Sequence, residues 1–348
     1  MSITIINDIG KITVFLLVLL SGFLITAKSK RKLPNYLFAA FLLVTSIDFT
    51  GFFLPTSQNI YIQGAKIASV LLQMPLYFLY VRSVCYYNFS FRKIHILHVV
   101  LFVGFYLVFL ITNEIEVYFG AFQTISKLQY YGYIIAIFYT LYQFKKVYME
   151  NYSNNHNSIY RWLLQTTILF LIGNSFVTVR EYLINDSSLF LYVNLFISLF
   201  ALGVISWFVL KALYQPQLFM GIDMNLTPTK PETEPLTETP QELRHLLNYM
   251  QTEKPYLEDQ LTLQKLAAGI NLPEKQLSQL INQHTGKHFF DYINTFRIQE
   301  AKTLLVAPSK LTVLEILYQV GFNSKSSFYT AFKKETGQTP TEFRKSNT

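Results

Sequence analysis

The sequence is short of cysteine and of charge. A single Cys among 348 residues excludes a disulfide framework and a cysteine-based zinc cluster. Charged residues make up only 14% of the chain, against roughly 25% in an ordinary soluble domain, which is too little for one soluble globule. Hydrophobic residues make up 51%, with 31 Phe and 24 Tyr, and this excludes an intrinsically disordered chain.

The net charge of +8 usually indicates a nucleic-acid or anionic-membrane partner. It is unevenly distributed: residues 1–220 carry +8, residues 221–240 carry −3 and residues 241–348 carry +3. The first part is apolar, the second is rich in Thr, Pro and Glu, and the third has the charge density of a soluble domain. We therefore expect a membrane domain at 1–214, a flexible linker at 215–240 and a soluble domain at 241–348.

Seven apolar runs in the first part have the length needed to cross the hydrocarbon core, about 20 residues. They are 9–27, 36–55, 64–84, 94–112, 123–144, 162–184 and 189–213. They are apolar on all sides, so we favour membrane spans over helices of a large soluble core. The basic cluster follows the first run instead of preceding it, which argues against a secretory signal peptide.

The positive-inside rule gives the orientation of these spans. Basic residues occupy only every second loop: Lys28, Lys30, Arg31, Lys32, Arg82, Arg92, Lys93, Lys145, Lys146 and Arg161. The alternate loops carry only the acids Glu114, Glu116 and Asp186. We therefore expect the N-terminus outside and everything after the seventh span in the cytoplasm.

Four polar residues lie near the outer ends of the predicted spans, namely Asp48, Arg180, Glu181 and Asn194. An ionisable group inside a membrane is costly and marks a functional site by default. One interpretation is a polar pocket in which a ligand is sensed from outside. The other is structural, with Arg180 reaching the interface and Asp48 pairing with a neighbouring helix. Neither His95 nor His98 has a partner at ligand spacing, so we expect no metal.

Residues 241–348 contain an internal sequence repeat. With an offset of 51, Leu277 corresponds to Phe328 and Ile281 to Phe332, and just upstream the offset is 50. Such a repeat implies two copies of one supersecondary unit.

Each copy is predicted to be a helix, a tight turn and a second helix. Thr262 and Thr312 are predicted to cap the first helices, at 263–268 and 313–320. Asn271 and Gly321 tolerate the left-handed backbone that the turns require. The second helices are predicted at 273–284 and 325–335, ending at Gly286 and Gly337. A long helix at 289–305 joins the copies, Pro308 stops it, and a further helix at 241–252 precedes the first copy.

The most specific stretches of this part are Val320-Gly321-Phe322-Asn323-Ser324-Lys325-Ser326-Ser327-Phe328, Phe332-Lys333-Lys334, Gly337-Gln338-Thr339-Pro340 and Phe343-Arg344. In these stretches residues 255–346 resemble the DNA-binding domain of the AraC family of transcription regulators. Leu317 departs from the family pattern, which usually has Ala there. Joined to seven spans, the domain also resembles membrane-bound bacterial regulators that carry a cytoplasmic AraC-type domain.

A double helix-turn-helix would place the second helix of each copy in successive major grooves, roughly 34 Å apart. Outward-facing positions, together with those that the resemblance implies, give the candidate DNA-contacting residues: Lys275, Gln276, Ser278, Gln279, Asn282, Lys325, Ser326, Ser327, Tyr329, Thr330 and Lys333. Gln276 and Gln279 suit adenine, whereas Lys275 suits guanine or phosphate. The resemblance assigns Ser327 and Lys333 to phosphate. An ordinary solvated helix face is the alternative.

These features together predict an all-α protein, a membrane-bound transcription regulator of the bacterial inner membrane that passes a signal to a cytoplasmic double helix-turn-helix. We expect no enzyme activity and no cofactor. The expected partners are double-stranded DNA, the lipid bilayer, a small-molecule or membrane signal, a second copy of the chain and RNA polymerase. Two alternatives stay open: an anchor that tethers specific DNA sites, and a transporter or membrane enzyme with an accessory DNA-binding domain.

Overall fold

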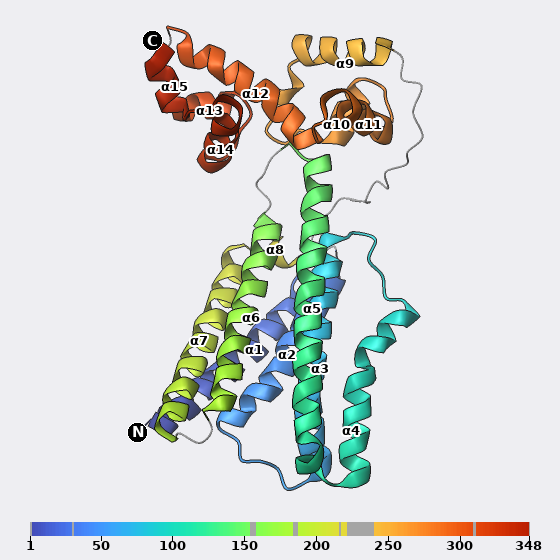
Figure 1. Ribbon diagram of the computed structural model, residues 1–348, viewed down its shortest axis with the longest axis vertical. Helices are drawn as coiled ribbons and strands as arrows, with labels where there is room; N and C mark the ends of the chain where they lie inside the picture. The colour runs from blue at the N-terminus through green and yellow to red at the C-terminus, as the bar shows by residue number, and fades with distance from the viewer. Residues whose placement is uncertain are drawn as a thin grey trace. The chain divides into compact units, whose positions relative to one another are not determined.

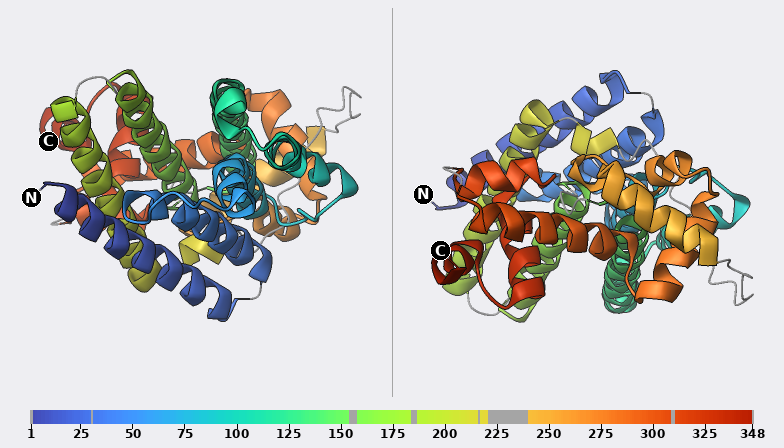
Figure 2. Two further views of the ribbon diagram at one scale, coloured as in Figure 1. Left: turned by 90° about the horizontal axis from the view of Figure 1, so that it is seen from below. Right: turned by 90° about the horizontal axis from the view of Figure 1, so that it is seen from above.

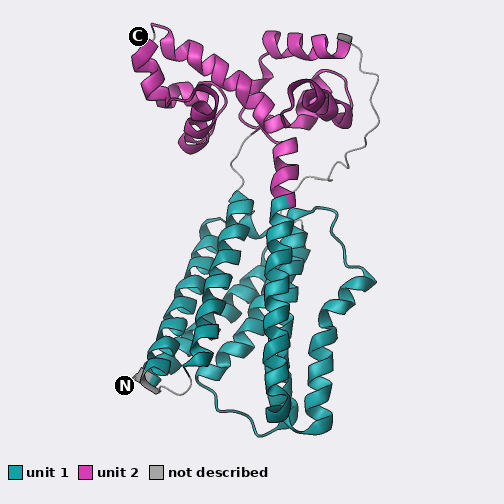
Figure 3. Ribbon diagram, in the orientation of Figure 1, with its two compact units in different colours: residues 1–142, 158–225 teal, residues 143–157, 226–348 magenta. Residues whose placement is uncertain are grey.

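A computed structural model shows a protein that is α-helical throughout the residues it describes (Figure 1). These are residues 2–29, 31–153, 158–183, 187–215, 217–220, 240–308 and 311–347. They form two compact units (Figure 3). The first comprises residues 1–142 and 158–225, and the second comprises residues 143–157 and 226–348.

The first unit is built from long apolar helices. They are α1 (Ser2–Thr26), α2 (Lys32–Phe49), α3 (Ile60–Cys85), α4 (Val100–Thr112), the first part of α5 (Ile115–Asn151), α6 (Ser158–Tyr182), α7 (Ser187–Tyr214) and the short α8 (Gln217–Met220). Two 3₁₀ segments, Thr50–Phe52 and Lys93–Val99, follow α2 and precede α4. α2 packs between α1 and α3, α1 also packs against α7, and α3 packs against α4 (Figure 2).

Six helical segments in the described part of the chain are long and apolar enough to cross a membrane. They are Ile3–Thr26, Lys32–Phe52, Ile60–Cys85, Lys93–Thr112, Ser158–Tyr182 and Leu189–Tyr214. The run predicted at 123–144 lies within α5, which is 37 residues long and is not among the six. Tyrosines, glutamines and Lys127 interrupt its apolar sequence, and this lowers its mean hydropathy.

An aromatic cluster fills the centre of the first unit. Trp162 is 1% exposed and donates its indole N–H to the Tyr80 hydroxyl at 3.1 Å. Phe38 stacks on Tyr80 with ring centroids 4.5 Å apart. Buried aromatic pairs of this kind add stabilisation beyond their apolar area, so the cluster holds α2, α3 and α6 together.

α8 lies within the range predicted as the linker, 215–240. Leu218 and Phe219 are 2% and 1% exposed, and the Phe219 ring lies 4.9 Å from that of Trp162. Leu218 and Phe219 therefore belong to the aromatic core of the first unit, because burying these two side chains outweighs the effect of the neighbouring prolines. Residues 221–239 of the predicted linker lie outside the described residues, as do Lys30 and Asp186.

The second unit contains two helix-turn-helix copies joined by one helix. Its elements after residue 239 are α9 (Pro240–Thr252), a 3₁₀ turn (Pro255–Leu257), α10 (Leu263–Gly269), α11 (Glu274–Thr285), α12 (Phe289–Val306), α13 (Val313–Gln319), α14 (Lys325–Thr336) and α15 (Pro340–Asn347). The helices predicted from the sequence lie within one or two residues of these bounds. α15 was not predicted.

α12 lies between the two helix-turn-helix copies (Figure 1). It supplies side chains to both hydrophobic cores of this unit. Its first half contributes Phe289 and Ile293 to the core of α10 and α11. Its second half contributes Ile298 and Leu305 to the core of α13 and α14. Leu317, the departure from the family pattern, is fully buried in the second core, so the larger side chain is accommodated there.

Candidate nucleic-acid interface

The first helix-turn-helix is held by local contacts that the sequence predicted. The Thr262 hydroxyl accepts a hydrogen bond from the Lys265 amide at 3.2 Å and caps α10. Asn271 forms the turn with a φ of 55°, and α11 starts directly after Pro273. Gly286 ends α11 with a φ of 64°. These caps and the turn fix the direction in which α11 leaves α10.

The second copy uses the same design with different residues. Thr312 and Glu315 form a reciprocal capping box at the start of α13. Gly321 forms the turn with a φ of 87°. The Ser324 hydroxyl then caps α14 by accepting from the Ser327 amide at 3.2 Å, and Gly337 ends the helix with a φ of 76°.

All the predicted DNA-contacting residues lie on two helices, α11 and α14, and none is fully buried, although Tyr329 packs against the second core. The exposed ones are Lys275, Asn282, Lys325, Ser326, Thr330 and Lys333. The half-buried ones are Gln276, Ser278, Gln279, Ser327 and Tyr329. Each helix therefore presents an outer face rich in amide, hydroxyl and ammonium groups, the groups that form hydrogen bonds to base edges and phosphates.

Several of these residues already contact protein groups. The Gln276 side chain donates from Nε2 to Oε1 of Glu242 on α9 at 2.8 Å, so part of its amide serves to hold α9. The Lys325 ammonium lies 5.3 Å from the centre of the Tyr329 ring, a cation–π arrangement that orients both side chains at the start of α14. Neighbouring Lys334 pairs instead with Asp291 of α12 at 2.7 Å.

Arg297 lies where the two copies meet. We call this contact the joint: it comprises residues 256–258 before α10, Arg297 of α12 and the turn at Gly321. Its guanidinium is fully buried, donating from Nε to the Tyr256 carbonyl at 2.7 Å and from Nη2 to the Glu258 carbonyl at 2.6 Å. It also lies 5.6 Å from the centre of the Phe322 ring, next to the turn of the second copy. Burial lowers the pKa of Arg297 to about 10, so the group remains a cation at neutral pH. The sequence pattern did not predict this role for Arg297.

The four polar residues of the predicted ligand pocket all belong to the first unit. Asp48 and Glu181 line a cavity of about 300 Å³ among α1, α2, α3, α5, α6 and α7. Arg180 donates instead from Nη1 to Oδ1 of Asn194 at 3.3 Å. Lys127 of α5, which sequence analysis did not single out, also lines the cavity and pairs with Glu181 at 2.5 Å. Lys127 could have been identified from the sequence as an isolated Lys in an apolar run.

No cluster of three or more His, Cys, Asp or Glu side chains suitable for a metal ion occurs among the described residues. The only cysteine, Cys85, is buried in α3.

Residues 266–346 match the family described as "Helix-turn-helix domain". Among similar proteins, the uncharacterised HTH-type transcriptional regulator YdeC of Bacillus subtilis is 30% identical over 105 residues, covering 30% of this chain and 35% of that protein. The HTH-type transcriptional regulator MtrA of Neisseria gonorrhoeae is 31% identical over 103 residues, covering 30% of this chain and 33% of that protein. The chain thus spans about a third of the length of these two relatives.

Among solved structures, the C-terminal domain of AraT, a response regulator from Geobacillus stearothermophilus, is 31% identical and covers 31% of this chain and 86% of that one, with a TM-score of 0.28. The residues that match the family lie on α10 to α15, the part that contains both helix-turn-helix copies. The chain carries a C-terminal AraC-type helix-turn-helix domain, and through it is related to the HTH-type transcriptional regulators.

Proposed function

We propose that the protein is a membrane-embedded transcription regulator that binds specific DNA sequences with α11 and α14. The observation that carries this proposal is the pair of outward polar helix faces on one domain, each preceded by a left-handed turn and both anchored on α12. Two such helices on one joint suit two successive major-groove segments of one duplex. A second copy of the chain and RNA polymerase are the protein partners that this role calls for.

The test is selection of DNA from a random duplex library with the full chain in lipid nanodiscs. We expect enrichment of a bipartite sequence with half-sites about one helical turn apart, and an affinity that falls as salt rises. The matched control is Thr303→Ala, an exposed position on α12, which should leave the selected sequence unchanged. Enrichment of no sequence over another would contradict specific binding.

We further propose that the first unit crosses the membrane seven times, with α5 as the fifth span and the N-terminus outside. Six described segments are apolar enough to span, and α5 is long enough for a crossing. The basic residues fall on one side of such an arrangement. Because Cys85 is buried, a membrane-impermeant maleimide should label Thr56→Cys in intact cells and spare Ser90→Cys until the cells are opened. The reverse pattern would contradict this topology.

The cavity of the first unit is the site at which we propose that a signal is sensed. It combines an apolar wall with the carboxylate of Asp48 and the Lys127–Glu181 ion pair, which suits a small molecule with an apolar body and a polar group. Its volume of about 300 Å³ is at the small end of the range for ligand pockets.

Expression profiling of a deletion strain distinguishes regulation from the two alternatives. A regulator changes the transcripts next to its selected DNA sites. An anchor that only tethers DNA leaves every transcript unchanged. A transporter or enzyme with an accessory domain still affects solute levels when all the DNA-contacting residues are substituted, because that activity does not depend on DNA binding.

A further inference from the structure

The end of α5 is an integral part of the second unit. α5 is one helix from Ile115 to Asn151, yet its residues from 143 onward belong to the unit that contains the helix-turn-helix copies. Tyr152 forms an antiparallel bridge with Thr262, the residue that caps α10. A helix that we propose as a membrane span therefore ends within the DNA-binding unit.

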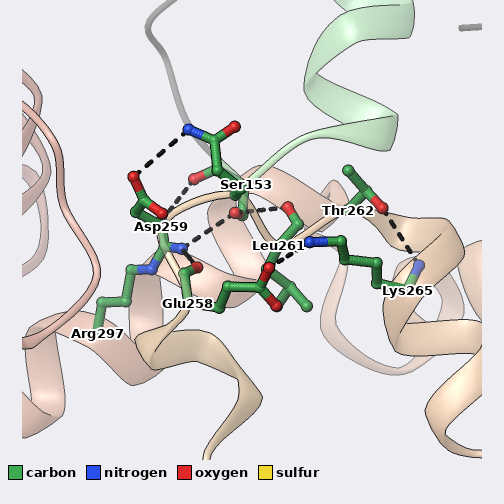
Figure 4. Close-up of polar contacts among 8 residues, drawn as sticks. Ser153, Glu258, Asp259, Leu261, Thr262, Lys265 and Arg297 are labelled. Carbon is green, nitrogen blue, oxygen red and sulfur yellow. Dashed lines mark hydrogen bonds and ion pairs between the residues drawn. The ribbon is translucent and has the colours of Figure 1, made fainter.

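Ser153 forms hydrogen bonds with Leu261 and Arg297 (Figure 4). Its amide donates to the Leu261 carbonyl at 3.2 Å, and its hydroxyl donates to the same oxygen at 2.7 Å. Arg297 donates from Nη1 to the Ser153 carbonyl at 2.8 Å and from Nη2 to Ser153 Oγ at 3.0 Å. Ser153 is 1% exposed and Arg297 is fully buried, so water does not compete for these bonds.

The buried guanidinium depends on Ser153. Its hydrogen-bond acceptors are the carbonyls of Tyr256, Glu258 and Ser153 and the Ser153 hydroxyl. Without Ser153, Nη1 of Arg297 loses its acceptor, and Nη2 loses one of its two acceptors. A buried cation with unsatisfied donors is strongly unfavourable, so withdrawal of the segment forces the joint to rearrange or to admit water.

Arg297 connects this segment to both helix-turn-helix copies. Tyr256 and Glu258 precede α10 of the first copy, while Phe322 and Gly321 form the turn of the second. A Cβ atom at Gly321 would lie 3.0 Å from Arg297 Nε, which shows how closely the second turn packs on the joint. The segment also meets the start of α12, where Glu150 Oε1 lies 3.9 Å from His288 Nδ1.

We propose that residues 143–153 are a docking element that controls DNA binding by the helix-turn-helix pair. While Ser153 holds Arg297, the joint is rigid and α11 and α14 are pre-organised for two half-sites, which raises affinity. Movement of α5 that withdraws Ser153 loosens the joint and lowers affinity. This mechanism rests on the proposed function and assigns to α5 the passage of the signal.

A disulfide cross-link tests docking directly in the full chain in nanodiscs. The ladder bond runs from the Ser153 amide to the Leu261 carbonyl, so Tyr152 and Thr262 are a non-hydrogen-bonded pair. The Cα atoms of such pairs are about 4.5 Å apart, within the range that a disulfide spans. Tyr152→Cys with Thr262→Cys should cross-link under diamide, as detected by mass spectrometry of digested protein. The control pair, Tyr152→Cys with Lys345→Cys on α15, should not.

Binding of the selected DNA should raise the cross-linking rate about 5-fold or more, because coupling between two equilibria is reciprocal. An absent cross-link overturns docking. Specific DNA binding with an unchanged cross-linking rate overturns the coupling alone. A cross-link without any specific DNA binding overturns the proposed function and with it the coupling.

Ser153→Ala provides an independent measurement. It removes the hydroxyl shared by Arg297 and Leu261 and leaves the Ser153 carbonyl in place, so the unit is expected to fold. The affinity of the full chain for its selected DNA should fall about 5-fold, and the DNA effect on the cross-linking rate should shrink in the same proportion. Ser175→Ala, which removes a serine-to-carbonyl bond within α6 at an exposed position, is the control for loss of a serine hydroxyl elsewhere. Equal affinity of the two variants overturns the proposal.

Discussion

The backbone of Gly321 packs against the carbonyl oxygen of Tyr256 so closely that a Cβ atom at position 321 would lie 2.6 Å from that oxygen. The Leu257 carbonyl would be 2.8 Å away. These two carbonyls belong to the segment that precedes the first helix-turn-helix, whereas Gly321 is the turn of the second. The close approach thus joins the two copies at the same point at which Arg297 lies.

Gly321→Ala should destabilise the second unit by about 3 kcal/mol or more, because a left-handed backbone and a steric clash act together. Gly337→Ala is the matched control: its φ of 76° is also left-handed, but the space around its Cβ is open. We expect a loss of only about 1 kcal/mol there. Denaturant unfolding of the full chain, followed by hydrogen exchange in α12 and α13, measures both. Equal losses would show that the carbonyl contact contributes nothing.

Local chemistry explains why the helix-turn-helix copies could be predicted. Thr262, Asn271 and Gly321 each act on backbone groups within a few residues. Their roles as caps and turn residues can therefore be predicted without tertiary information. Arg297 is different, because its acceptors come from loops 39 to 144 residues away in the sequence. Nothing in the sequence around Ser153 distinguishes it from an ordinary loop serine.

The long apolar helices of the first unit were predictable, and the arrangement of its interior was less so. Apolar runs indicate helices by composition alone, but which polar groups share a cavity depends on helix rotation. Asp48 and Glu181 therefore line one cavity, and Arg180 donates a hydrogen bond to Asn194. The same dependence on packing explains α8, where burial of Leu218 and Phe219 extends the unit into the predicted linker.

Lys325 and Lys333 should contribute differently to DNA binding. Lys325 lies in the first turn of α14, beside Tyr329, so we expect Lys325→Ala to cost about 1–3 kcal/mol at its preferred base pair and to relax sequence preference there. Lys333 lies in the last turn. Lys333→Ala should weaken all sequences alike and reduce the salt slope by about one unit. Binding isotherms on matched and mismatched duplexes at several salt concentrations separate the two effects. Identical profiles for the two variants would contradict this assignment.

The capping box of α13 predicts a pH dependence of stability. The Thr312 amide and hydroxyl donate to the Glu315 carboxylate at 2.7 and 2.8 Å and lower its pKa below the ordinary value of 4.5. A carboxylate with a lowered pKa in the folded state stabilises the fold above its unfolded pKa, and this contribution is lost as pH falls through the folded pKa. Glu315→Gln should therefore lower the unfolding midpoint at pH 7, and the difference from the parent should shrink below pH about 4.

The control for this measurement is Glu253→Gln, an exposed carboxylate at the end of the turn after α9. It should unfold with the parent at both pH values. A Glu315→Gln defect that persists unchanged at low pH would show that the carboxylate charge is not the cause. Thr339 and Glu342 repeat the arrangement at the start of α15, where the Thr339 amide donates to Glu342 at 2.8 Å. Adding Glu342→Gln to Glu315→Gln should therefore lower the unfolding midpoint at pH 7 further.

Asp48 provides the sharpest test of sensing by the first unit. Its carboxylate lines the cavity together with the Lys127–Glu181 pair, whereas Asp8 pairs with Lys11 on an exposed part of α1. Asp48→Asn keeps the shape of the cavity wall but removes its charge, so a ligand held through that charge should bind about 10-fold more weakly. A reporter driven by the selected DNA site should then lose its change in output between growth conditions, while DNA binding by the purified chain stays intact. Asp8→Asn should respond like the parent, and a normal response from Asp48→Asn would place sensing outside this cavity.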